Sequence, residues 1–149
     1  MLFLSTYHNR LDKKGRISIP AQFRSVLAGQ QSEGIVAYAS PINPSIEACG
    51  MQRIMKFNQR VEQFEPYSSE RDAFSAMLFG ESVQLSFDTE GRVMLPESLI
   101  ATAGLAEQVT IVGKGETFEM WEPGAFAVYI ERVRKIVREK RAELKGDAP

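Results

Sequence analysis

The sequence is poor in the residues that build disulfides, metal sites and catalytic centres. Among its 149 residues there is one cysteine, Cys49, and one histidine, His8. A lone cysteine forms no internal disulfide, and with a lone histidine it cannot supply the four ligands of a zinc site. We therefore expect a protein of a reducing compartment that holds no metal and no other cofactor.

Long apolar runs are also missing. No run approaches the roughly 20 residues of a membrane-spanning helix. The start of the chain, MLFLSTYHNR, is apolar over only its first four residues, which is too short for the core of a signal peptide. The sequence thus predicts a cytoplasmic protein with no membrane partner.

No residue pattern indicates catalysis. His8 falls on an expected strand without a partner, and Cys49 has no cation beside it that would activate its thiol. The stretch GKGE at 113–116 lacks the length and the downstream Lys-Ser or Lys-Thr pair of a phosphate-binding loop, and it is typical of a hairpin turn. We predict that the protein is not an enzyme.

The charge balance excludes one mode of nucleic-acid binding. With 18 Lys and Arg against 19 Asp and Glu, the formal net charge is −1. A chain of that charge does not coat a polyanion through bulk positive charge, so any such binding needs a local patch. The remaining composition, 44% hydrophobic and 25% charged, is that of a folded globular domain.

One short charged stretch occurs twice. LDKKGRISIP at 11–20 is followed, 76 residues later, by DTEGRVMLP within LSFDTEGRVMLP at 85–96. The offset pairs four chemically special residues of each copy: Asp12 with Asp88, Gly15 with Gly91, Arg16 with Arg92, and Pro20 with Pro96. Self-similarity of this kind indicates a duplicated unit.

Each copy has the pattern of strand, tight turn, strand, short helix, strand, strand. Apolar and polar residues alternate on both sides of the second turn, as in half-buried strands, and each turn is interpreted as joining a hairpin. Asp12 and Asp88 are expected to accept backbone N–H bonds in the turn, and Gly15 and Gly91 to supply a left-handed residue. Pro20 and Pro96 suit the start of a helix.

Helical periodicity marks the rest of the chain. A stripe from Ile54 to Phe64 and a capping-box pattern opening at Ser69 predict two helices, and a further apolar stripe predicts a helix from about Pro123. The expected division is a first repeat at 1–50, a helical connector at 51–80, a second repeat at 81–124 and a C-terminal helix at 125–149.

Only the first copy is basic. Arg10, Lys13, Lys14 and Arg16 give residues 8–16 a net charge of +3, whereas residues 84–92 carry −1. Strand alternation places Arg10 and Arg16 on one exposed face, where arginine can bond two phosphate oxygens or a guanine edge and lysines can attract the backbone. A solvated surface explains so small a patch equally well, unless several copies act on one DNA.

The C-terminal helix offers a rival patch. Residues 131–145 hold seven cations against three glutamates. We interpret this as a solvated helix face with spaced ion pairs such as Glu131 with Lys135. Direct DNA contact by this helix is the less favoured alternative.

The paired motifs DKKGRISIP and DTEGRVMLP, with IVGKGETFEMW after the second, resemble the MraZ family, which is built from two SpoVT-AbrB repeats. The resemblance covers essentially the whole chain. It implies an α+β fold in which the repeats form an interleaved β-barrel with additional helices packed on it. It also implies a ring-like homo-oligomer that binds double-stranded promoter DNA at short direct repeats, mostly as a repressor of the division and cell-wall gene cluster that includes its own gene.

The arginine of the family's D-x-x-x-R element falls on Arg16, its second-copy counterpart falls on Arg92, and the lysine that commonly precedes the glycine falls on Lys14. The second copy departs from the pattern because Glu90 stands in the lysine's place. We therefore expect Arg16, with Arg10, to hold the DNA, Lys13 and Lys14 to contact phosphates, and Arg92 to contribute less. The alternative from another class is an oligomeric scaffold whose basic hairpins dock acidic proteins.

Overall fold

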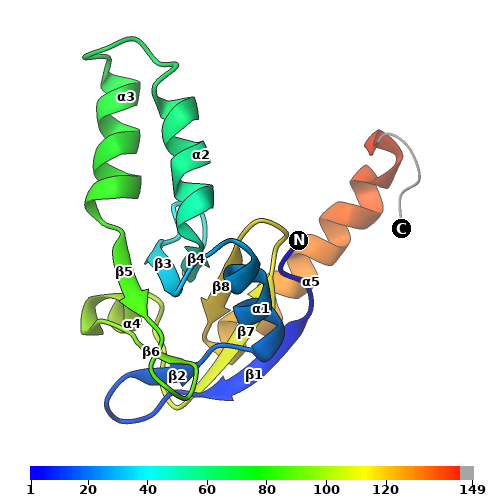
Figure 1. The fold of residues 1–149 in the computed structure, drawn as a ribbon. Helices are drawn as coiled ribbons and strands as arrows, with labels where there is room; N and C mark the ends of the chain where they lie inside the picture. Colours follow the sequence, from blue (N-terminus) through cyan, green and yellow to red (C-terminus); the bar gives the residue numbers. More distant parts are fainter. Residues whose placement is uncertain (145–149) are drawn as a thin grey trace.

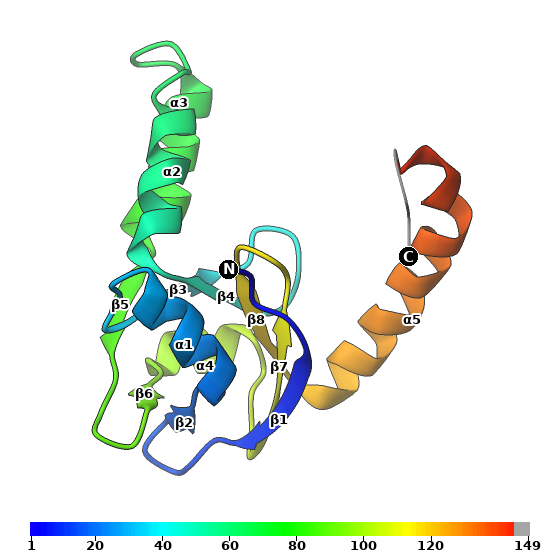
Figure 2. The ribbon, with the colours of Figure 1, turned by 45° about the vertical axis from the view of Figure 1, so that its right-hand side comes forward.

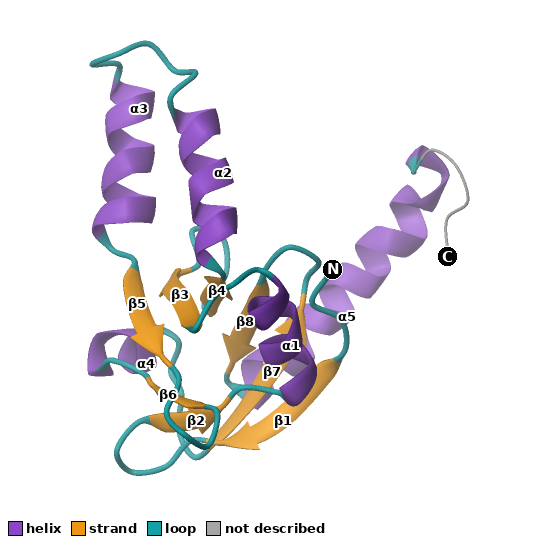
Figure 3. Cartoon of the chain, viewed as in Figure 1, coloured by secondary structure: helices purple, strands orange, loops and turns teal. Residues whose placement is uncertain are grey.

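The computed structural model describes residues 1–144, and over this range the protein has a mixed α+β fold (Figure 1, Figure 3). Its strands are short and all are paired antiparallel. They are β1 (Thr6–Arg10), β2 (Arg16–Ser18), β3 (Gly34–Ala39), β4 (Ile46–Cys49), β5 (Val83–Ser86), β6 (Arg92–Met94), β7 (Gln108–Gly113) and β8 (Phe118–Trp121). The predicted α+β class is confirmed.

Helices follow the second strand of each copy, fill the long connection between β4 and β5, and follow the last strand, β8. They are α1 (Ala21–Gly29), α2 (Met51–Val61), α3 (Ser69–Phe74) with a π-helical continuation (Ser75–Gly80), α4 (Glu97–Thr102) and α5 (Pro123–Lys140), which ends in a 3₁₀ turn (Arg141–Glu143). The end of the expected segment 125–149, including Lys145, lies outside the described residues.

Local chemistry sets where these helices begin. Pro20 and Pro96 are the residues before α1 and α4, where a missing N–H removes no helical hydrogen bond. The Glu122 carboxylate caps α5 by accepting from two backbone N–H groups of its first turn. The cap of α3 is Ser68, whose hydroxyl accepts from the Arg71 N–H at 3.2 Å, so the cap predicted at Ser69 is wrong by one residue.

The strand order mixes the two halves of the chain. A six-stranded sheet runs β1-β7-β8-β4-β3-β5, and β2 pairs with β6 in a separate two-stranded sheet. Thus β1 and β4 of the first half pair with β7 and β8 of the second, and β5 of the second half pairs with β3 of the first. Within residues 1–144 the outer strands β1 and β5 are not paired with each other, and no closed barrel forms.

This exchange corrects the expected hairpins at the two charged turns. Between β1 and β2 only one bridge remains, Leu11 to Ile17. A hairpin of two short strands is marginal by itself, whereas strands that exchange partners let both halves share one core. The hairpin expected at 113–116 is confirmed, because β7 and β8 pair on either side of it.

The main core lies between the sheets and the short helices. It draws on both halves of the chain: Phe3, Ile17 and Phe23 from the first pack with Val93 and Phe118 from the second. Phe3 contacts Phe23 edge-on at a ring distance of 5.2 Å and Phe118 at 5.0 Å.

Two helical arms project from this core. One is the pair α2 and α3, which lie side by side and extend away from the sheet, and the other is α5, which leaves the body on a different side (Figure 1, Figure 2). No helix among the described residues is long and apolar enough to cross a membrane.

Candidate nucleic-acid interface

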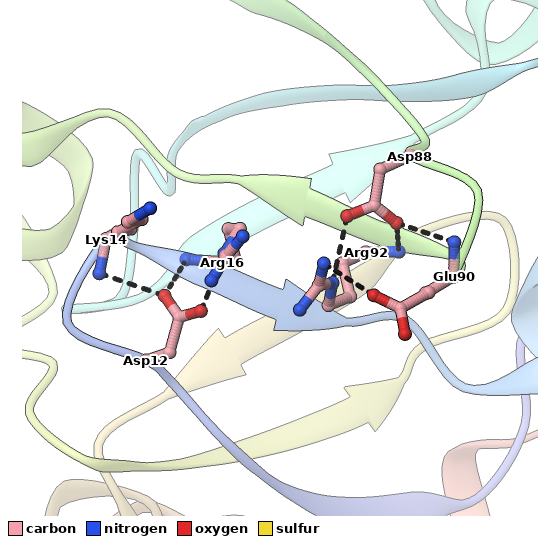
Figure 4. Close-up of polar contacts among 6 residues, drawn as sticks. All are labelled: Asp12, Lys14, Arg16, Asp88, Glu90 and Arg92. Carbon is pink, nitrogen blue, oxygen red and sulfur yellow. Dashed lines mark hydrogen bonds and ion pairs between the residues drawn. The ribbon is translucent and has the colours of Figure 1, made fainter.

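The first charged turn is organised by one carboxylate (Figure 4). Asp12 accepts the backbone N–H of Lys14 at 2.9 Å and that of Arg16 at 2.8 Å. Its second oxygen, Oδ2, accepts the Nε–H of the Arg16 side chain at 2.7 Å. The aspartate therefore shapes the loop and also fixes the direction of the arginine.

The second turn repeats this geometry. Asp88 accepts the backbone N–H groups of Glu90 and Arg92, each at 2.9 Å, and the Arg92 Nε–H at 2.8 Å. The backbone bonds to Arg16 and Arg92 are the largest influence that lowers the pKa of Asp12 and of Asp88 respectively. Both carboxylates are therefore ionised at neutral pH.

The glycines of the turns tie the two copies together. Gly15 has φ of +87° and Gly91 +76°, in the region that favours glycine. The Gly15 carbonyl accepts the Leu95 N–H at 2.8 Å, and the Gly91 carbonyl accepts the Ile19 N–H at 3.1 Å. Each turn is thus held against the strand end of the other copy.

The small β2–β6 sheet carries the two arginines on its outer face. Ile17 and Val93 are opposite each other and buried, so the residues on either side of them point away from the core. Arg16 lies opposite Met94 and Arg92 opposite Ser18. The arginines therefore sit at opposite ends of one face.

A single difference separates the two arginines chemically. Nη2 of Arg92 lies 2.6 Å from a carboxylate oxygen of Glu90, so two acids hold its guanidinium. Arg16 has Asp12 as its one carboxylate partner within residues 1–144, and Lys14 stands where the second copy has Glu90. The Nη groups of Arg16 have no carboxylate partner within residues 1–144, whereas Nη2 of Arg92 has one in Glu90.

An open groove of about 580 Å³ gathers the cations of the first copy. Arg10, Lys13, Lys14 and Arg16 all line it, together with Leu11, Asp12, Ala106 and Glu107. In the described part of the chain, Arg10, Lys13 and Lys14 make no salt bridge. Arg92 lies outside the lining, so the structure brings four of the five predicted DNA-contacting residues together and leaves the fifth apart.

One further cation lies near the second turn. Arg24 of α1 donates from Nε to the Ile19 carbonyl at 3.0 Å, and its guanidinium lies so close to Gly91 that a Cβ there would meet it at 2.7 Å. No site role was predicted for it from the sequence. Its position one helical turn after Pro20 places it near the first turn. Only the pairing of β2 with β6 brings its guanidinium beside Gly91 of the second turn.

The other titratable candidates are occupied in structural roles. His8 Nδ1 is 3.1 Å from the Thr110 hydroxyl. Cys49 is fully buried, and burial, the largest influence, raises the pKa of its thiol to about 12. Residues 1–144 contain no group of three or more His, Cys, Asp and Glu side chains that could hold a metal.

On α5 the predicted pairing of Glu131 with Lys135 is wrong, since Glu131 pairs with Arg134 at 2.8 Å. A second pair, Lys140 with Glu143 at 3.4 Å, lies near the end of the helix. Both are exposed pairs at a spacing of three residues, a geometry that the helix permits as readily as a spacing of four.

Comparison with known proteins gives one consistent family. The family model described as "MraZ protein, putative antitoxin-like" matches residues 2–39 and 78–147. Relatives named "Transcriptional regulator MraZ" from Rickettsia canadensis, Rickettsia felis and Rickettsia bellii are each 51% identical, and each alignment covers 97% of both chains.

The fold and the site define a small α+β protein with two charged turns of the same backbone geometry, of which the first lines a basic groove. The chain belongs to the MraZ family and is a transcriptional regulator. Membership of a family of regulators implies a protein that is not an enzyme.

Proposed function

We propose that this regulator binds double-stranded promoter DNA through the first turn and represses transcription. Its targets would be short direct repeats upstream of the division and cell-wall gene cluster that includes its own gene. Arg16 would read or clamp the DNA with help from Arg10, and Lys13 and Lys14 would contact phosphates. The protein would then act in the cytoplasm, on the nucleoid.

The observation that carries this proposal is the free Nη end of Arg16 in a groove lined by three other cations. Arginine binds the O6 and N7 atoms of guanine, or two phosphate oxygens, with a pair of parallel N–H groups. Asp12 engages Nε alone, so it orients the guanidinium without occupying its end. In the second copy Glu90 takes that end, which supports a lesser role for Arg92.

One such groove is too weak for a stable complex, so we propose that several copies act together in a ring-like homo-oligomer. Phosphate contacts made by neighbouring copies reinforce one another on one DNA molecule. The exchange of strands between the two halves is consistent with the interleaved barrel of SpoVT-AbrB repeats, which we retain as the proposed architecture.

Binding of fluorescent DNA tests the proposal, with the region upstream of the chain's own gene as probe and a shuffled probe of equal composition as reference. Arg16→Ala should weaken binding to the upstream probe at least tenfold, the effect of about 1.4 kcal/mol, because it removes a bidentate contact. Arg92→Ala, the matched control, should change affinity less than threefold. Wild-type affinity should fall as salt rises.

Equal losses for Arg16→Ala and Arg92→Ala would show that both turns contact DNA alike. Unchanged affinity for Arg16→Ala would refute its role. Equal affinity of the wild type for upstream and shuffled probes would refute sequence-specific binding.

A further inference from the structure

The two projecting arms (Figure 1, Figure 2) take no part in the proposed DNA contact. Both expose apolar side chains. The distal half of α5 and its 3₁₀ turn, residues 131–144, is named here the α5 arm. The pair α2 and α3 with the loop between them is named the α2–α3 arm.

The apolar side chains of the α5 arm are exposed within residues 1–144. The first half of α5 is anchored, since Phe126 and Tyr129 pack on Trp121. Beyond it, Ile136 is 49% and Val137 59% exposed, and these two residues continue the apolar stripe along the helix. Helices of this length are marginal in water unless such a stripe is buried.

The α2–α3 arm presents a complementary hollow. A groove of about 420 Å³ lies where the arm meets the sheet. Half of its lining residues are apolar residues of α2, α3 and the π-helical continuation, namely Ile54, Phe57, Ala73, Phe74, Met77, Leu78 and Phe79, and the rest of the lining includes the charged residues Glu47, Arg53, Lys114 and Glu116. Phe74 and Met77 are 42% and 48% exposed there. A groove of this size accepts several aliphatic side chains of a helix.

The ends of the two arms carry opposite charge. The tip of the α2–α3 arm, residues 62–72, holds four acids and one arginine, a net of −3. The α5 arm, residues 131–144, holds six cations and three glutamates, a net of +3. Complementary charge favours one partner and one orientation, with the far end of α5 toward the acidic tip.

We propose that the α5 arm of one copy packs into the α2–α3 groove of a second copy, with its cations facing the acidic tip. The contact rests on the proposed homo-oligomer and names its interface. Because the two surfaces are different parts of one chain, the contact is head-to-tail, and repetition of a head-to-tail contact closes a ring when its rotation permits. In this contact the cations of α5 bind a second copy of the chain and not DNA. DNA phosphates would pair with the cations but would leave the apolar stripe exposed to water.

Charge reversal tests the contact through the mass of the full chain in sedimentation velocity. Glu65→Lys with Glu70→Lys reverses the tip, and Lys135→Glu with Arg138→Glu reverses the α5 arm. Each pair alone should weaken self-association at least tenfold and shift the mass toward that of one chain. The four substitutions combined should restore the wild-type assembly, because the reversed surfaces match again.

All four residues are exposed, so circular dichroism should show that each variant keeps the wild-type fold. Val137→Asp, which charges the apolar stripe, should also dissociate the assembly, and the tip reversal should not rescue it. Arg16→Ala should keep the wild-type mass, which separates this interface from the DNA site.

A wild-type mass in both charge-reversed pairs, or no recovery in the combined variant, would overturn the proposed contact while the DNA-binding proposal stands. If the double variant Lys135→Glu with Arg138→Glu keeps the wild-type mass but loses DNA binding, the contact between copies is overturned and α5 contacts DNA. A monomeric wild-type chain would refute both the contact and the ring, and absence of DNA binding by an intact oligomer would refute only the proposed function.

Discussion

At the scale of single residues, an aspartate and an arginine four positions apart form one rigid unit in each copy. The Asp12 and Asp88 carboxylates accept backbone N–H groups of their own turn and the Nε–H of their arginine. The spacing D-x-x-x-R is visible in the sequence, but the aspartates alone suggested only a turn. The copies differ at the residue two positions before the arginine, which is Lys14 in the first copy and Glu90 in the second. Glu90 pairs with an Nη group of its arginine.

This difference predicts the effect of converting the first turn into the second. Lys14→Glu should place a carboxylate on the Nη end of Arg16, as Glu90 does on Arg92, and should weaken DNA binding roughly tenfold or more. Lys14→Gln is the matched control, since it removes the cation without adding the acid, and should lose only a few-fold of affinity. Fluorescence anisotropy at two salt concentrations measures both. Equal losses in the two variants would mean that only the charge of Lys14 matters.

At the scale of elements, the sequence predicts where strands and helices lie better than which strands pair. Alternation around Val83 and Leu85 locates β5 correctly, and proline and glycine bound α1, because these are local signals. The partners of β1 and β2 are 74 or more residues away in the chain. Hydrophobic periodicity shows which face of a strand is buried but not which strand it pairs with. The basic groove at the first turn could not be predicted without the strand pairing, because Ala106 and Glu107 of the second half complete its lining.

The anchoring of α5 to the sheet depends on a buried acid that strand alternation did not reveal. Glu119 on β8 is 1% exposed, accepts the Trp121 indole N–H at 2.8 Å and the Lys114 ammonium at 3.1 Å. Lys114 also bonds the Tyr129 hydroxyl of α5 at 3.1 Å. Burial opposes the charge of Lys114, but its bonds to Tyr129 and Glu119 outweigh this, and its pKa is raised.

Glu119→Ala should therefore lower the free energy of unfolding by about 2–3 kcal/mol, because it leaves a buried indole N–H and an ammonium without their acceptor. Glu119→Gln keeps an oxygen for Trp121 and should lose less. Urea unfolding followed by the fluorescence of Trp121, the sole tryptophan, gives both values. Unchanged stability in Glu119→Ala would show that α5 is held by ring stacking alone.

At the scale of the whole molecule, the two copies are halves of one core. Ile17 and Val93 face each other across the β2–β6 sheet, and each turn is bonded to the strand end of the other copy. A unit of the first 50 residues would keep the β3–β4 pair, but β1 and β2 would lose β7 and β6. The apolar side chains that those strands bury would be exposed to water.

We therefore expect residues 1–50 and residues 81–149 to be unfolded when made separately, with poorly dispersed amide signals in NMR spectra. Units this small rarely bury enough surface to fold alone. Here each fragment also loses four of the five strand pairings that its strands make. Mixing the two fragments should restore dispersed signals, because every partner except the α2–α3 arm is then present. A dispersed spectrum from residues 1–50 alone would mean that the turn forms a stable hairpin without β7 and β6. The pairing across the halves would then not be what holds the basic groove in shape.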